Sequence, residues 1–115
     1  MKKVEMILTV GGKRALMPIK YYDEICTFIV RELEQNDGLR FVELLDKADS
    51  VIGSEMRGNL SWYLLHVKHD LQARNIIRVE RDVNRVQIIQ LRRKYKEKLR
   101  AFRAELKMPS GTDRS

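Results

Sequence analysis

The sequence predicts an α+β fold, because three helix-type segments are followed by a segment of β type. Apolar residues recur at helical spacing between residues 23 and 74, and β-branched residues then dominate 76–91. A hairpin-like segment precedes the helices, and one more helical pattern follows residue 91. Three helices followed by a hairpin is the element order of a winged helix-turn-helix. We therefore expect that fold, with an N-terminal β-hairpin and an added C-terminal helix.

The chain is short and basic. Its 115 residues, 43% of them hydrophobic, suit one compact domain, and 23 Lys and Arg against 16 Asp and Glu give a net charge of +7. Cys26 is the only cysteine, which excludes an internal disulfide. No stretch approaches the roughly 20 apolar residues of a membrane span, and the apolar run 6–10 is too short for a signal peptide. We expect a cytoplasmic protein with an anionic partner and no membrane contact.

The positive charge is concentrated near the C-terminus. Eight basic and two acidic residues lie between Arg92 and Lys107, whereas residues 1–91 are close to neutral. We expect a winged-helix domain over 1–91 that includes the hairpin at 4–19, a basic amphipathic helix at 92–107, and a disordered tail at 108–115.

The first half of the chain is punctuated by turn-forming residues. Gly11-Gly12 predicts a turn between strands at 4–10 and 15–19, and Pro18 places the second strand at an edge or an end. Asp23 is expected to cap the first helix, which Asn36-Asp37-Gly38 would end.

The remaining elements follow from periodicity. A second helix is expected from about Arg40 to Ala48 and a third from about Asn59 to Arg74, with Leu60, Leu64, Val67 and Leu71 on its buried side. Strands at 76–81 and 86–91 would flank a turn at 82–85, and a final helix would begin at Arg92.

The segment Ser61 to Arg78 contains Trp62-Tyr63, Val67-Lys68, Asp70-Leu71 and Ala73-Arg74-Asn75. It resembles a poorly characterised prokaryotic winged helix-turn-helix family with a WY…VK.DL.ARG.I.R pattern, and the resemblance extends loosely over residues 12–91. Asn75 stands where that pattern has glycine, and Asn also tolerates the left-handed conformation. The resemblance implies a fold of DNA-binding type and carries no ligand.

In a helix-turn-helix, the face of the third helix opposite the core enters the major groove. At 100° per residue, this face holds Asn59, Trp62, His66 and His69. Asn can pair with adenine, and an aromatic ring can touch a thymine methyl group. A solvent-facing Trp is unusual, however, and Trp62 is more often covered by another element.

Phosphate contacts are expected from two regions. The hairpin carries Arg78, Arg81 and Arg85 around Asn84, although ordinary solvated charge explains these residues equally well. The final helix begins with Arg92, Arg93 and Lys94, and Arg57 and Lys68 are weaker candidates. The apolar stripe of this helix is too short for an independent coiled coil, so it packs either on its own domain or in a homodimer.

Catalytic interpretations are weak. Gly11-Gly12-Lys13 lacks the remaining residues of a phosphate loop, and His66 with His69 lacks a clear third metal ligand. A buried structural thiol is the expected role of Cys26. The sequence therefore predicts no cofactor, no metal and no enzymatic activity. It favours a double-stranded-DNA-binding protein, a small transcription regulator, with a winged-helix protein-interaction module as the alternative.

Overall fold

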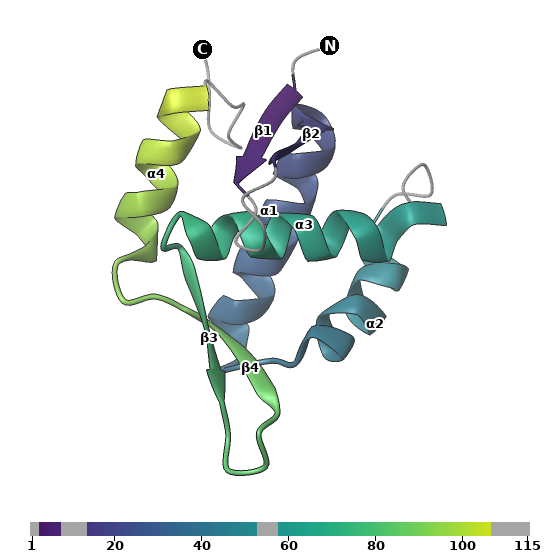
Figure 1. The fold of residues 1–115 in the computed structure, drawn as a ribbon, viewed down its shortest axis with the longest axis vertical. Helices are drawn as coiled ribbons and strands as arrows, with labels where there is room; N and C mark the ends of the chain where they lie inside the picture. Colours follow the sequence, from purple (N-terminus) through teal and green to yellow (C-terminus); the bar gives the residue numbers. More distant parts are fainter. Residues whose placement is uncertain (1–2, 8–13, 53–57, 107–115) are drawn as a thin grey trace.

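The described residues of the protein form an α+β fold of four helices and two separate antiparallel strand pairs. The computed structural model describes residues 3–7, 14–52 and 58–106. The elements follow one another in the order β1 (Lys3–Ile7), β2 (Arg14–Pro18), α1 (Ile19–Gln35), α2 (Phe41–Val51), α3 (Leu60–Ala73), β3 (Ile77–Arg81), β4 (Gln87–Leu91) and α4 (Tyr95–Leu106). Helix α3 crosses in front of α1, the β3–β4 hairpin projects from the body, and α4 returns beside α1 (Figure 1). This element order matches the one predicted from the sequence.

The N-terminal hairpin forms as expected. β1 and β2 pair antiparallel, with Lys3 opposite Pro18 and Ile7 opposite Arg14. β2 ends at Pro18, as a residue without a backbone N–H requires. The glycine turn predicted between the strands lies outside the described residues.

Helix α1 begins earlier than predicted. Pro18 is its N-cap at φ −56°, and the helix starts at Ile19, so the assignment of Asp23 as the cap is wrong. The restricted φ of proline already suits a helix start. The Asp23 carboxylate instead accepts an ion pair from Arg103 of α4, with Nη1 to Oδ1 at 2.9 Å.

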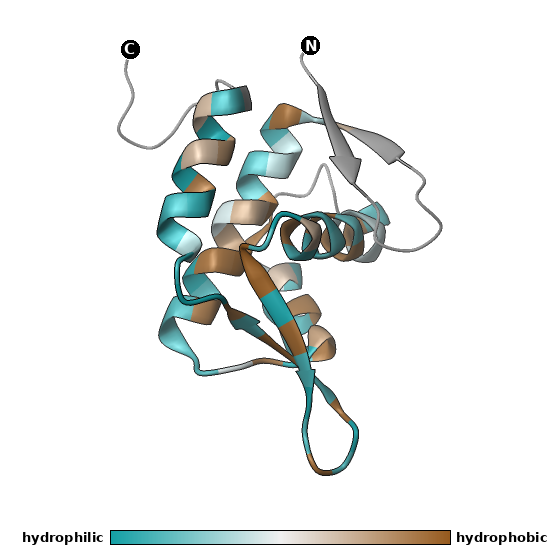
Figure 2. Ribbon diagram, turned by 60° about the vertical axis from the view of Figure 1, so that its left-hand side comes forward, coloured by the Kyte–Doolittle hydropathy of each residue, from teal (hydrophilic) through white to brown (hydrophobic). Residues whose placement is uncertain are grey.

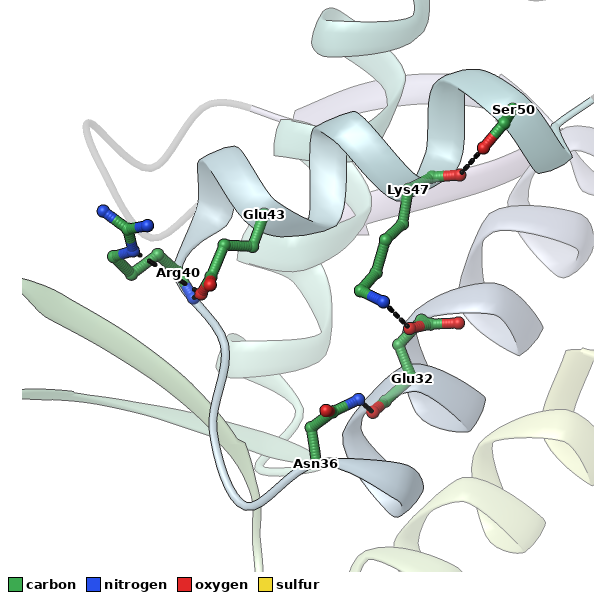
Figure 3. Close-up of polar contacts among 6 residues, drawn as sticks. All are labelled: Glu32, Asn36, Arg40, Glu43, Lys47 and Ser50. Atoms are coloured by element: carbon green, nitrogen blue, oxygen red, sulfur yellow. Dashed lines mark hydrogen bonds and ion pairs between the residues drawn. The ribbon is translucent and has the colours of Figure 1, made fainter.

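The connection between α1 and α2 is held by local polar contacts (Figure 3). The Asn36 side-chain amide donates to the Glu32 carbonyl at 2.8 Å, where α1 ends as predicted. The Arg40 backbone N–H donates to Glu43 Oε1 at 2.8 Å at the start of α2, and Lys47 of α2 pairs with Glu32 at 3.5 Å. Helix α2 continues to Val51, beyond the predicted end at Ala48.

Asn75 ends α3 in a left-handed conformation, with φ 63°. The Ile76 N–H donates to the Leu71 carbonyl at 2.9 Å and the Asn75 N–H to the Gln72 carbonyl at 3.1 Å, which is the Schellman arrangement. The chain therefore turns directly from α3 into β3.

The second hairpin pairs Ile77 with Leu91 and Arg81 with Gln87. Asp82 organises its tip, because its Oδ1 accepts the backbone N–H groups of Asn84 at 2.8 Å and Val86 at 3.0 Å. The base of the hairpin is tied to the body by paired backbone hydrogen bonds between Leu39 and Ile89.

The core lies where α1, α2, α3 and the base of the second hairpin meet. The predicted stripe Leu60, Leu64, Val67 and Leu71 is buried, as is Cys26. The hydrophobic colours of Figure 2 accordingly lie mainly where the elements pack, whereas α4 is largely hydrophilic. No helix among the described residues is long and apolar enough to cross a membrane.

Helix α4 packs on its own domain. Phe102 is 4% exposed and its ring meets Tyr22 of α1 edge to face, with centroids 5.6 Å apart. The Arg74 guanidinium lies 4.0 Å from the centre of the same ring, and the fully buried Asp70 accepts hydrogen bonds from Arg74 and from the Tyr22 hydroxyl. Of the two arrangements that the sequence left open for this helix, the single chain forms the back-packed one.

Candidate nucleic-acid interface

The outward face of α3 carries aromatic rings, and the Lys and Asp side chains of this helix are buried. Trp62 is 43% exposed and Leu65 is 38% exposed, so both side chains are accessible to a partner. The Trp62 indole stacks on His66 at 4.1 Å between ring centroids and meets Tyr63 edge to face at 5.2 Å. His66 Nδ1 is 2.8 Å from the Trp62 carbonyl, which holds the imidazole over the indole. Tyr63 in turn meets Tyr21 of α1 edge to face at 5.5 Å, so the rings of α3 continue into the packed side of the molecule.

His69 adds no full positive charge to this face near neutral pH. Partial burial, followed by the neighbouring Lys68 and His66, lowers its pKa below the ordinary 6.5. The Lys and the Asp of α3, Lys68 and Asp70, lie among its buried residues. Helix α3 therefore offers rings, an apolar side chain and hydrogen-bonding groups to a partner.

The residues of α3 that were predicted to contact DNA do not all lie on its outward face. Asn59 is exposed at the N-cap of α3, and Trp62, His66 and His69 follow it along the same side of the helix. Lys68 is only 6% exposed, and burial lowers the pKa of its ammonium group. Lys68 therefore does not join the exposed cations as expected, because its position turns toward the packed side of α3. Arg57 lies outside the described residues.

The β3–β4 hairpin exposes Arg81, Asn84 and Arg85 around its tip. Arg78, nearer the body, pairs with Glu80 at 2.8 Å. Asp82 is engaged by the backbone of the turn, so the two acidic residues that interrupt the hairpin both have local partners. No described carboxylate forms an ion pair with Arg81 or Arg85.

A basic cavity lies where the base of the hairpin meets the start of α4. It measures about 780 Å³. Its lining consists of Asn75, Arg78, Leu91, Arg92, Arg93, Lys94 and Lys98. Five of these seven side chains are cationic and none is acidic, so we name this feature the basic pocket.

The backbone beneath the basic pocket is fixed by hydrogen bonds. The left-handed Asn75 turns the chain so that the Ile76 carbonyl accepts the Arg92 N–H at 3.0 Å. The Arg92 carbonyl accepts the Tyr95 N–H at 3.1 Å, which starts α4 three residues later than predicted. Arg92, Arg93 and Lys94 therefore occupy the short link between β4 and α4.

The start of α4 is anchored by a second contact. The Tyr95 hydroxyl donates to Glu34 Oε2 of α1 at 2.6 Å, and this hydrogen bond raises the pKa of Tyr95 to about 12. One turn before the end of α4, Arg103 bonds both Asp23 and the Thr27 hydroxyl, the latter at 3.1 Å. Residues 92–94, which link β4 to α4, therefore lie between two elements that are both held on the body.

Comparison with known families gives one match, which covers residues 3–88 and is described as a family of unknown function, DUF6958. The chain belongs to this family. The DUF6958 match includes both hairpins up to the middle of β4 and ends before α4. Neither the curated proteins nor the solved structures contain a match.

Sequence reasoning found most of the cations of this surface but not their arrangement. Arg78, Arg92, Arg93 and Lys94 were expected as separate contacts on the hairpin and on the final helix, and the structure brings them into one pocket. Asn75, Leu91 and Lys98 were missed as lining residues. The lining residues come together because β3 pairs with β4 and α4 docks on α1, and these are long-range contacts. Asn75, whose left-handed conformation ends α3, is a local feature that indicates the turn of the chain toward the pocket.

Metal chemistry finds no support in the described part of the chain. No group of three His, Cys, Asp or Glu side chains among those residues is placed to hold an ion. Burial raises the pKa of the Cys26 thiol to about 12, which is opposite to the activation that a nucleophilic cysteine needs.

Proposed function

We propose that this chain is a winged helix-turn-helix protein that binds double-stranded DNA and regulates transcription. Helix α3 would enter the major groove, the β3–β4 hairpin would act as the wing, and the cations of the hairpin and the basic pocket would contact phosphates. The order α1, α2, α3, β3, β4 supports the fold assignment.

The observation that carries this proposal is that cations without ion-pair partners gather where the base of the β3–β4 hairpin meets the start of α4. Arg92, Arg93, Lys94 and Lys98 form no ion pair with a described residue, although Asp23, Glu32 and Asp70 elsewhere are all engaged. Four clustered like charges are unfavourable in the free protein, and neutralisation by phosphates would relieve their repulsion.

Equilibrium binding to a fluorescent random-sequence duplex tests the proposal. The double variant Arg81→Ala/Arg85→Ala should weaken binding about equally for different sequences and reduce the salt dependence by about two counterions. Arg31→Ala/Arg100→Ala removes the same charge from exposed positions of α1 and α4 that form no ion pair with a described residue, and serves as the matched control. If both variants lose the same DNA affinity, the effect comes from the overall charge of the protein, and a contact between the wing and DNA is contradicted.

Truncation after Leu91 is unsuitable for this purpose. It would remove Phe102 from Tyr22 and Arg74 and uncover the core, so that a loss of DNA binding would have two causes. Charge-removing substitutions at exposed positions leave these contacts in place.

One observation favours a protein-interaction module as the second candidate. Trp62 and Leu65 are exposed on a helix whose Lys and Asp side chains are buried, and aromatic residues are enriched at protein interfaces. Trp62 is the only tryptophan of the chain, so its fluorescence reports on α3 alone. A change in Trp62 emission on addition of DNA supports groove insertion. Unchanged emission while DNA binds assigns this face to another partner.

A further inference from the structure

We infer that the basic pocket is a binding site for a compact polyphosphate group, supplied either by a nucleic-acid backbone or by a free phosphate compound. The inference goes beyond the proposed function, because a free polyphosphate can fill this site without any DNA. It assigns a ligand chemistry to a cavity, whereas the proposed function concerns the exposed surface as a whole.

The first argument is shape. The basic pocket is open to solvent, because six of its seven lining residues are exposed, and its volume of about 780 Å³ is within the usual size of small-ligand sites, about 300–1,000 Å³. The lining comes from β3 (Arg78), β4 (Leu91) and α4 (Lys98), together with Asn75 after α3 and the link 92–94 between β4 and α4. A concave site of this size can surround several phosphate oxygens at once.

The second argument is charge. Arg78, Arg92, Arg93, Lys94 and Lys98 line the cavity, and Arg78 alone has a described carboxylate partner. Guanidinium groups form paired hydrogen bonds with phosphate oxygens, whereas ammonium groups act as point charges. Three arginines and two lysines match a ligand with two or more adjacent phosphates better than a single carboxylate.

The third argument is preorganisation. The backbone under the pocket is held by the Schellman turn at Asn75 and by the hydrogen bond from Arg92 to Ile76, while Tyr95 fastens α4 to α1. Binding therefore has to order the exposed cationic side chains but not the backbone beneath them, which limits the entropic cost. Leu91 adds an apolar wall, and the Asn75 amide can donate to an oxygen.

Titration calorimetry with inorganic tripolyphosphate at constant ionic strength tests the inference in the full chain. We expect saturable binding at one site, weakened at least tenfold by Arg92→Ala/Arg93→Ala, because charged hydrogen bonds to phosphate are lost. Lys96→Ala/Arg100→Ala is the matched control: it removes two charges from the other flank of α4, and these residues do not line the pocket. Its effect should stay below about threefold, as expected for screened charges outside the site.

A second arm separates the two sources of phosphate and the two proposals. Competition between tripolyphosphate and a labelled duplex identifies the nucleic-acid backbone as an occupant of the pocket. If the protein binds tripolyphosphate but no duplex, the pocket is a site for a free phosphate compound. The same result overturns the DNA proposal. Duplex binding without saturable tripolyphosphate binding overturns the pocket inference alone, as does an equal loss of tripolyphosphate affinity in both double variants.

Discussion

Replacement of Phe102 by alanine tests how α4 is held on the body. The ring is 4% exposed, contacts Tyr22 edge to face and lies 4.0 Å below the Arg74 guanidinium. Arg74 in turn is bonded to the fully buried Asp70 at 2.7 Å. Loss of the ring therefore removes apolar packing and also opens a path for water to a buried ion pair.

The expected cost is about 3 kcal/mol. Truncation of a buried phenylalanine to alanine costs about 3–5 kcal/mol, and about 1 kcal/mol of that comes here from the contacts with Tyr22 and Arg74. The lower end applies because a terminal helix can undock without unfolding the remaining elements. At about 4 °C per kcal/mol for a chain of this size, the melting temperature should fall by about 12 °C.

Thermal unfolding followed by circular dichroism measures this effect. Phe102→Leu, which keeps apolar volume, should lose about half as much, and the exposed Lys96→Ala should change stability by less than about 0.5 kcal/mol. A loss below about 1 kcal/mol for Phe102→Ala would refute the docking of α4. A loss that depends on protein concentration would show that the helix packs on a second copy of the chain instead.

Three further substitutions test separate parts of the structure. Arg85 has φ 64°, so Arg85→Gly should stabilise the fold by about 1 kcal/mol in thermal unfolding while weakening DNA binding; a destabilised variant would contradict the turn geometry. Gly38→Ala places a Cβ 2.5 Å from Ile88 Cγ2 and should cost about 1–3 kcal/mol in denaturant unfolding, and an unchanged midpoint would argue against this close approach to β4. The hydrogen bond to Glu34 raises the pKa of Tyr95 to about 12, so this contact stabilises the fold below pH 10 and is lost as the pH rises through 12. Glu34→Ala, which removes the acceptor, should return one tyrosine to titration near pH 10 in ultraviolet absorbance, and an unshifted titration curve would exclude the contact.

The helices and hairpins were predictable because their signals are local. The stripe from Leu60 to Leu71 has helical spacing, and the β-branched residues after Ile76 alternate as a hairpin requires. The start of α1 was misplaced because Asp23 has the side chain of a capping residue, whereas the helix begins directly after Pro18, which lacks the backbone N–H that a helix interior requires. Lys68 was likewise predicted to be exposed from its sequence alone, whereas tertiary packing buries it.

The arrangement of the candidate site was less accessible to sequence reasoning. Arg78 and Lys98 share a cavity only because β4 pairs with β3 and α4 folds back onto α1. The partners that fix α4 are 61 residues apart for Tyr95 with Glu34 and 76 for Arg103 with Thr27. Contacts of such separation leave no periodic pattern in the chain. The sequence therefore indicated the charges but not the pocket that they form.

The salt dependence of binding to a duplex tests the proposed function most directly. Contacts from Arg81, Arg85, Arg92, Arg93 and Lys94 would release counterions from five phosphates, and about 0.9 per phosphate gives a slope of about −4.5 in log affinity against log salt concentration. The proposal predicts a slope between about −3 and −5 that becomes shallower in Arg92→Ala/Arg93→Ala. A slope near zero, or no binding at low salt, would contradict the assignment of this surface to DNA.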